Sequence, residues 1–218
     1  MNQDSRLRYL EPGDIIRSND PCVTNQARSL VEGLTAEADR ARALFYFVRD
    51  QIRYNPYSPY DKPEHYWPAA TLKRGEGYCV QKSVLLAALA RATGMPARLV
   101  FADIVNHRLS EKLLEMMKTN VFVYHGYVEL LVQGRWIRVT PVFEKPLCEK
   151  LDIKPVDFDG LNEAIFHRLD NQGRVHIEYV KEHGIYADVP LDEIMSVWRE
   201  VYPLEQMDMP SDWDWLAE

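Results

Sequence analysis

Cys79 and His125 are the residues of this sequence whose types and surroundings best suit nucleophilic chemistry. Cys79 follows Gly75 and Gly77, which permit a tight turn, and it starts a run of good helix formers. Unpaired N–H groups and the positive end of a helix dipole stabilise a thiolate, the nucleophilic form of cysteine. The sequence therefore predicts a reactive thiol, with a pKa below that of free cysteine, for which His125 acts as the base.

Two strands are predicted downstream, and the first of them carries His125. Residues 121–132 are rich in β-branched and aromatic side chains, and residues 135–140 form the second strand. Gln133 and Gly134 lie between the strands as a two-residue hairpin turn. A loop of this length fixes how the two strands pair.

That register determines which side chains share a face. Glu129 lies opposite Arg138 in it, where the two charges can form an ion pair. Strict alternation places His125 on the face that runs from residue 121 to residue 131. Thr140 joins the same face as a diagonal neighbour of His125, about 7–8 Å away between Cα atoms.

The helix that starts at Cys79 is predicted to be buried on most sides. Residues 83–90 have almost no polar face, which is typical of a helix enclosed by other elements. Gly94 supplies a C-terminal stop and Pro96 prevents the helix from resuming. The other predicted elements are a helix over residues 35–52 capped by Thr35, an irregular aromatic loop over 54–68, a strand at 98–102, a helix at 110–118, two strands at 164–168 and 174–179, a helix opened by Pro190, and an acidic tail at 208–218.

The composition excludes several classes of partner. A net charge of −7 and a pI near 5.4 argue against a nucleic-acid partner held by phosphate contacts. No apolar run is long enough to span a membrane, and the polar start is unlike a secretory signal. The three cysteines are too few and too far apart for a disulfide framework, so we expect a reducing, cytoplasmic environment in which Cys22 and Cys148 are spectators. No cysteine or histidine pair has zinc-site spacing, and nothing requires calcium or another cofactor.

These motifs resemble the transglutaminase-like superfamily of papain-type cysteine enzymes. The Gly-x-Cys turn of that family is similar to residues 77–79, and its Gly-φ-Pro-x-Arg stretch is similar to residues 94–98. Residues 125–129 resemble its histidine strand, and residues 136–141 resemble its strand in which Trp precedes a catalytic Asp-Pro. The resemblance covers roughly residues 35–145.

The resemblance implies an α+β fold in which a central buried helix packs on an antiparallel sheet. It divides one compact domain into an N-terminal wrap (1–34), a transglutaminase-like core (35–145) and a C-terminal extension (146–218). It also implies acyl transfer or hydrolysis on a peptide, a glutaminyl side chain or a related amide. Cys79 would attack, His125 would relay the proton, and the Cys79 backbone N–H, rather than Gln81, would stabilise the oxyanion.

Thr140 departs from the family pattern because it stands where the family has Asp. Threonine can accept a hydrogen bond from an imidazole but carries no charge, and in a comparable serine triad the loss of this carboxylate lowers turnover by roughly 10⁴. Glu144, Asp157 and Asp159 are close enough in sequence to be considered as replacement acids.

Other interpretations of the same residues remain open. Cys79 could be a buried inert cysteine, His125 a hydrogen-bonded sheet histidine, and Thr140 a plain strand residue. The main alternative to an enzyme is a catalytically impaired transglutaminase fold that binds a peptide or partner in the same cleft. A metal-bound hydrolase is a weaker third idea.

Overall fold

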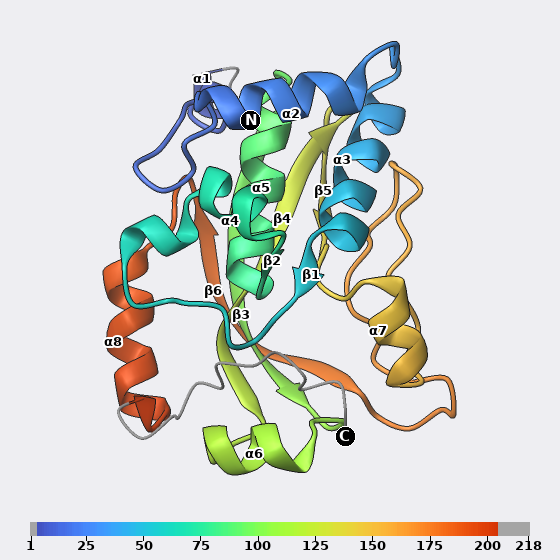
Figure 1. The fold of residues 1–218 in the computed structure, drawn as a ribbon. Helices are drawn as coiled ribbons and strands as arrows, with labels where there is room; N and C mark the ends of the chain where they lie inside the picture. The colour runs from blue at the N-terminus through green and yellow to red at the C-terminus, as the bar shows by residue number, and fades with distance from the viewer. Residues whose placement is uncertain (1–3, 205–218) are drawn as a thin grey trace.

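A four-stranded antiparallel sheet with one helix against it organises the protein (Figure 1). The computed structural model describes residues 4–204. The helix is α5 (Cys79–Ala92), which packs on β4 and β3. The strands lie in the order β5 (Arg135–Val139), β4 (Val121–Val132), β3 (Ala97–Asn106) and β6 (Ile177–Tyr186). The α+β class and the central helix on an antiparallel sheet are therefore as the sequence predicts.

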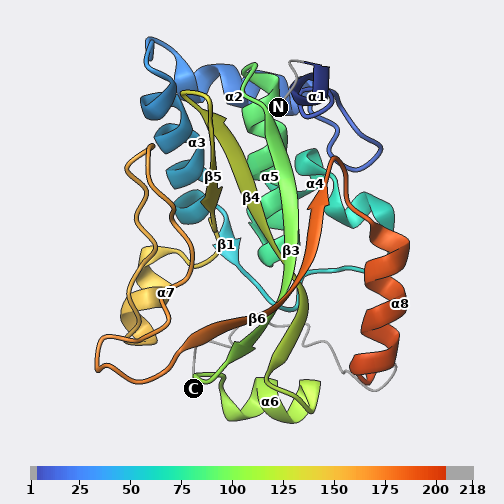
Figure 2. The same cartoon turned by 180° about the vertical axis from the view of Figure 1, so that it is seen from behind.

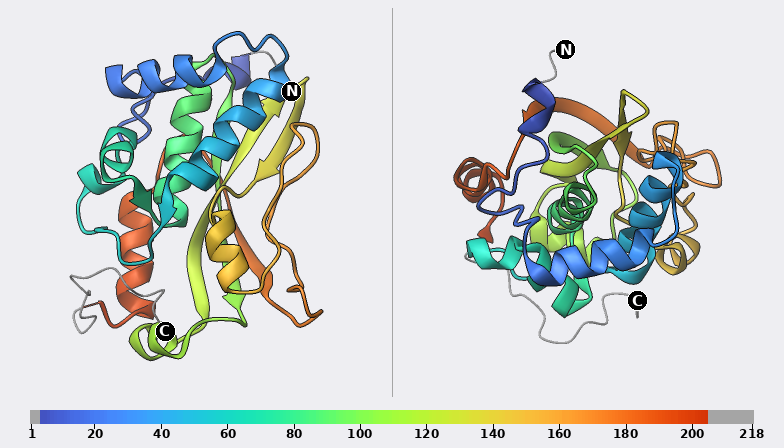
Figure 3. Two further views of the ribbon diagram at one scale, coloured as in Figure 1. Left: turned by 45° about the vertical axis from the view of Figure 1, so that its right-hand side comes forward. Right: turned by 90° about the horizontal axis from the view of Figure 1, so that it is seen from above.

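Three helices cover α5 on the side away from the sheet, so that it lies at the centre of the molecule (Figure 3). They are α2 (Pro21–Val31), α3 (Glu37–Gln51) and α4 (Pro68–Arg74). Every residue of α5 from Cys79 to Arg91 is buried, as the absence of a polar face predicts. The burial includes polar side chains such as Lys82, which must therefore find partners inside the protein.

The β4–β5 hairpin has the predicted register. Gln133 and Gly134 both have positive φ angles, 49° and 77°, as a two-residue turn of type I′ requires. Glu129 lies opposite Arg138, and its carboxylate accepts hydrogen bonds from Arg138 Nε at 3.3 Å and from Arg98 Nε at 2.5 Å.

A β-bulge interrupts the strict alternation that the sequence predicts for β4. His125 pairs with Ala102, but Phe122 pairs with Ile104, so the register shifts between them. Tyr124 has a φ of 57° at this point, and its N–H donates to the Asp103 carboxylate at 3.0 Å. The bulge immediately precedes His125, from which regular pairing with β3 continues to Leu130.

The helices of this protein differ in how they begin. α3 starts after Ala36, not Thr35, and has no side-chain cap. α4 follows the predicted aromatic loop and α7 (Lys145–Lys150) follows β5, and each has a proline in its first turn, where proline is well tolerated. α6 (Glu111–Met117) is capped by Ser110 as expected. The remaining short elements are α1 (Asp4–Leu7), β1 (Arg53–Tyr54), η1 (Pro63–Tyr66) and β2 (Glu76–Gly77).

The predicted pair of strands at 164–168 and 174–179 forms only in part: Leu169 and Val175 make an isolated antiparallel bridge across the turn, and residues 164–168 form no strand. Ala164 makes only an isolated bridge to β5, with its N–H bonded to Arg138 O and its carbonyl accepting from Thr140 N, each at 2.8 Å. β6 begins at Ile177 and pairs with β3 along the sheet edge (Figure 2). α8 (Leu191–Val201) follows Pro190, and the acidic tail at 208–218 lies outside the described residues. No helix within residues 4–204 is long and apolar enough to cross a membrane.

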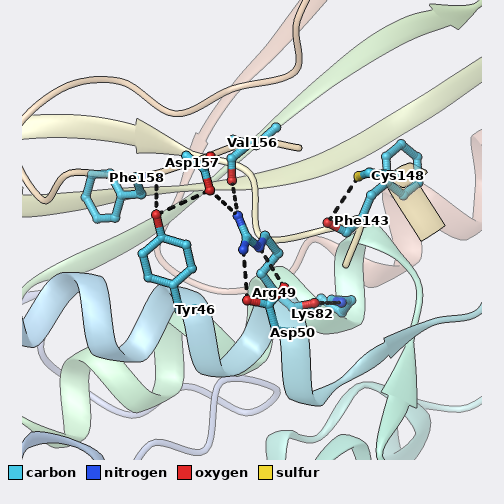
Figure 4. A network of polar contacts seen from close by, with 9 residues as sticks. All are labelled: Tyr46, Arg49, Asp50, Lys82, Phe143, Cys148, Val156, Asp157 and Phe158. Carbon is cyan, nitrogen blue, oxygen red and sulfur yellow. Dashed lines mark hydrogen bonds and ion pairs between the residues drawn. The ribbon is translucent and has the colours of Figure 1, made fainter. Parts of the chain in front are cut away.

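A charged network attaches the segment after α7 to the core (Figure 4). The fully buried Arg49 donates to Val156 O at 2.7 Å, to Asp157 at 2.8 Å, and to Asp50 through two bonds of 2.8 Å. Lys82 Nζ donates to Arg49 O at 3.1 Å and to Ile52 O. Lys82 thus caps the C-terminal end of α3, where free carbonyls favour a cation.

Candidate active site

Cys79 is the first residue of α5, and a sequence of tight local contacts places it there. Gly75 ends α4 with a φ of 70°, which glycine adopts at little cost, and β2 then leads into the extended N-cap residue Tyr78. Gln81 Oε1 accepts from Tyr78 N at 3.3 Å, and Gln81 Nε2 donates to Pro59 O at 2.8 Å. Gln81 is therefore buried and bonds the aromatic loop to the helix.

The first turn of α5 lies directly against β4 at Gly126. A Cβ atom on Gly126 would come within 3.2 Å of Val80 Cα, a tighter contact than most side chains make, so glycine favours this close approach. Ser83 Oγ donates to Gly126 O at 2.9 Å and holds the helix in place. Because Gly126 follows His125, this contact brings the thiol of Cys79 and the imidazole to the walls of the same two cavities.

The electrostatics at Cys79 differ from the sequence-based expectation. Burial raises the pKa of the thiol to about 11, and backbone interactions at Gly126, Val80 and Cys79 itself lower it by less. The helix N-terminus acts in the predicted direction, but the surrounding elements remove the solvation that a thiolate needs. The resting thiol is therefore protonated at neutral pH.

His125 is buried in its neutral form. Burial alone lowers its pKa to about 3, and its Nε2 atom is buried without a hydrogen-bond partner. Its ring lies among aromatic side chains, with a centroid 5.2 Å from that of Phe166 and 6.1 Å from that of Tyr179. A neutral imidazole can accept a proton, so the protonation state suits a general base.

Two further buried hydroxyls lie in this region: that of Tyr179, whose ring is near the imidazole, and that of Thr140, which is close to Tyr179. Thr140 is fully buried. The hydroxyl of Tyr179 is also buried; burial raises its pKa, and interactions with the Thr140 side chain and the Phe166 backbone partly offset the rise. Tyr179 has no signal in the sequence, because it reaches this place only through the pairing of β6 with β3.

The three carboxylates considered as replacement acids are bonded elsewhere. Glu144 Oε2 accepts from Tyr54 N at 2.9 Å, Asp157 is held by Arg49, and Asp159 accepts from the backbone at Leu161 and Asn162. None of them contributes to the pKa of His125. Within residues 4–204, no group of three or more His, Cys, Asp or Glu side chains is placed to hold a metal ion.

This chain shares its sequence pattern with a known protein family. The sequence profile of the family described as the transglutaminase-like superfamily matches residues 24–141, more than half of the 218 residues. This chain belongs to the transglutaminase-like superfamily. None of the curated proteins matches its sequence.

The fold of this chain is similar to that of solved structures. A "Putative Cysteine Protease" from Cytophaga hutchinsonii superposes with a TM-score of 0.52 at 16% identity, over 85% of this chain and 55% of that one. The periplasmic domain of TgpA from Pseudomonas aeruginosa gives a TM-score of 0.48 at 19% identity, over 65% of this chain and 48% of that one. The chain thus spans about half the length of the structures it matches.

Proposed function

We propose that this protein is a transglutaminase-like cysteine enzyme that transfers or hydrolyses the acyl group of a peptide or related amide. One observation carries the proposal: the close contact of α5 with Gly126 sets Cys79 and His125 on the walls of the same cavities. A purely structural cysteine and histidine would not need to open on a shared cavity.

The reaction begins from two neutral groups. Cys79 Sγ attacks the carbonyl carbon while His125 takes the thiol proton, and the backbone N–H of Cys79 stabilises the oxyanion. His125 then gives the proton to the departing amine, which leaves a thioester on Cys79. Water or an acceptor amine attacks the thioester with His125 again as base, and the thiol is restored.

The protonation states support proton transfer during the attack rather than a preformed ion pair. A raised thiol pKa and a lowered imidazole pKa both favour the neutral forms at rest. Thr140 and Tyr179 can accept a hydrogen bond from the imidazolium that forms, but they add no charge. The chemistry should therefore be slower than with a carboxylate in this position.

Acylation of Cys79 tests the proposal directly. The protein is mixed with p-nitrophenyl acetate, nitrophenol release is followed, and the acetylated residue is located by mass spectrometry. We expect a burst of one nitrophenol per protein with the adduct on Cys79, and loss of the burst in Cys79→Ala and His125→Ala. Cys22→Ser, which removes an exposed cysteine, is the matched control and keeps the burst.

The second candidate function is a binding module with an inactive cleft. The uncharged site and the raised thiol pKa favour it. It predicts that Cys79 is not acylated faster than Cys22, even at high pH, while peptides still bind the cleft. Equal acylation rates at the two cysteines would therefore contradict the enzymatic proposal.

A further inference from the structure

The larger of the two cavities at Cys79 has an apolar wall built largely by elements other than the central helix. It contains about 660 Å³ of space free of protein atoms, including its opening to solvent. No Asp, Glu, Lys or Arg of residues 4–204 lines it. Its wall comes from α6, β4 and α8, through Leu113, Met116, Met117, Phe122, Trp198 and Tyr202.

The polar atoms of the Trp198 and Tyr202 side chains already have hydrogen-bond partners. Trp198 Nε1 donates to Val123 O at 3.0 Å. The Tyr202 hydroxyl accepts from Val123 N at 2.8 Å and donates to Val121 O at 3.1 Å. These bonds fasten α8 to the bulged part of β4, and the indole and phenol rings present carbon surface to the cavity.

The second cavity differs in chemistry although it shares Cys79 and His125. Asn106, Arg108 and Ser110 line it, so it offers hydrogen-bonding groups and a positive charge. The catalytic pair thus lies between an apolar cavity and a more polar one. A substrate bound across Cys79 is therefore oriented by the polarity of its two ends, with an apolar group on the α6–α8 side.

We propose that the acyl substrate carries a bulky, uncharged apolar side chain next to its reactive carbonyl, held between α6 and α8. The reaction in this inference rests on the proposed function, whereas the binding of the apolar side chain does not. An apolar group gains from leaving water, whereas a charged one would lose its hydration with no partner in the wall. Met116 and Met117 have adaptable side chains, so both aromatic and branched aliphatic groups fit.

Binding to Cys79→Ala separates this inference from catalysis. N-acetyl-phenylalaninamide, N-acetyl-leucinamide, N-acetyl-aspartamide and N-acetyl-lysinamide are titrated into the full chain and followed by NMR. We expect the two apolar amides to bind at least about tenfold more tightly than the charged ones. Equal affinities, or a preference for a charged amide, would overturn the inference.

A pair of variants on α6 locates the binding. Met116→Glu places a charge in the cavity wall, whereas Leu114→Glu places the same charge on the exposed side of the helix. We expect Met116→Glu to weaken binding of N-acetyl-phenylalaninamide at least about tenfold and Leu114→Glu to leave it unchanged. Thermal unfolding of both variants shows that each is folded; equal effects of the two would place the ligand elsewhere.

The outcomes for binding and for catalysis are distinguishable. Selective binding to Cys79→Ala with no acylation of the wild type would remove the proposed function and keep the apolar site. Acylation at Cys79 with equal kcat/KM for apolar and charged acyl esters would keep the function and remove the inference.

Discussion

Two clusters of polar side chains in this protein differ in charge and in hydrogen bonding. Around Arg49 the groups are charged and paired, with bonds to Asp50, Asp157 and Val156. Around His125 the groups are neutral: His125 Nε2 has no hydrogen-bond partner within residues 4–204, and the Thr140 and Tyr179 hydroxyls are buried close to each other. The first cluster joins the segment after α7 to the core, and the second lies at the candidate active site.

The comparison shows where this protein uses its carboxylates. Asp157 accepts a hydrogen bond from Arg49. Glu144 accepts a hydrogen bond from Tyr54 N and interacts electrostatically with Lys82. A buried guanidinium requires such partners, because an unpaired ion in the interior is very costly. Neutral hydroxyls cost much less to bury, so they can remain beside a base whose partner changes during a reaction.

The largest expected effect comes from breaking the charged cluster. Arg49→Met leaves the buried Val156 carbonyl without its partner and should lower the free energy of unfolding by about 1–3 kcal/mol, whereas the exposed carboxylate of Asp157 is then solvated by water. Urea unfolding measures the change. Arg42→Met, which removes an exposed ion pair with Asp39, is the control and should change stability by less than about 0.5 kcal/mol. Equal losses would mean that the cluster contributes no more than a surface pair.

Acid should destabilise the protein through the neutral cluster. Burial lowers the pKa of His125 to about 3, whereas an unfolded histidine titrates near 6.5. The unfolded chain therefore binds an extra proton between these values, and stability falls as the pH drops from about 6.5 toward 3. His125→Gln should reduce the slope of stability against pH by up to about 1.4 kcal/mol per pH unit.

Urea unfolding at pH 6.5, 5.5 and 4.5 measures that slope. Burial also lowers the pKa of His176, to about 4, so some acid sensitivity remains in the His125→Gln variant. An unchanged slope would show that His125 is not buried in its neutral form.

Introducing a charge into the neutral cluster around His125 tests whether the lack of charge slows the reaction. Thr140→Asp supplies a carboxylate beside His125, which stabilises the imidazolium formed during attack and raises the pKa of His125. We expect acylation of Cys79 at pH 7 to accelerate about tenfold, at some cost in stability from the buried charge. Thr140→Asn, which adds similar bulk without charge, should not accelerate it. The same gain from both variants would assign the effect to packing.

The smallest effect is expected at Tyr179. Its hydroxyl is buried close to the Thr140 side chain and the Phe166 backbone, so Tyr179→Phe should change the free energy of unfolding by at most about 1 kcal/mol. Thermal unfolding measures this. Tyr66→Phe is the comparison, since the Tyr66 hydroxyl contacts Met195 Sδ at 4.0 Å. A loss of more than about 1 kcal/mol in Tyr179→Phe would reveal a stronger bond that this hydroxyl makes in solution.

Local patterns in the sequence predicted much of the fold and the principal candidate residues. The buried helix starting at Cys79 follows from the apolar run between Gly75 and Gly94, and the hairpin register follows from Gln133 and Gly134. Both rest on backbone preferences within a few residues, which no distant segment needs to supply. The position of Thr140 near His125 follows from the same register.

The tertiary structure alone decided the chemistry of the site. β6 pairs with β3 and brings Tyr179 beside His125, although 54 residues separate the two in the chain numbering. Burial, not the helix N-terminus, sets the pKa of Cys79, because segments distant in sequence exclude water from the thiol. Solvation and long-range pairing depend on every element packed around a residue, so the spacing of residues along the chain does not contain them.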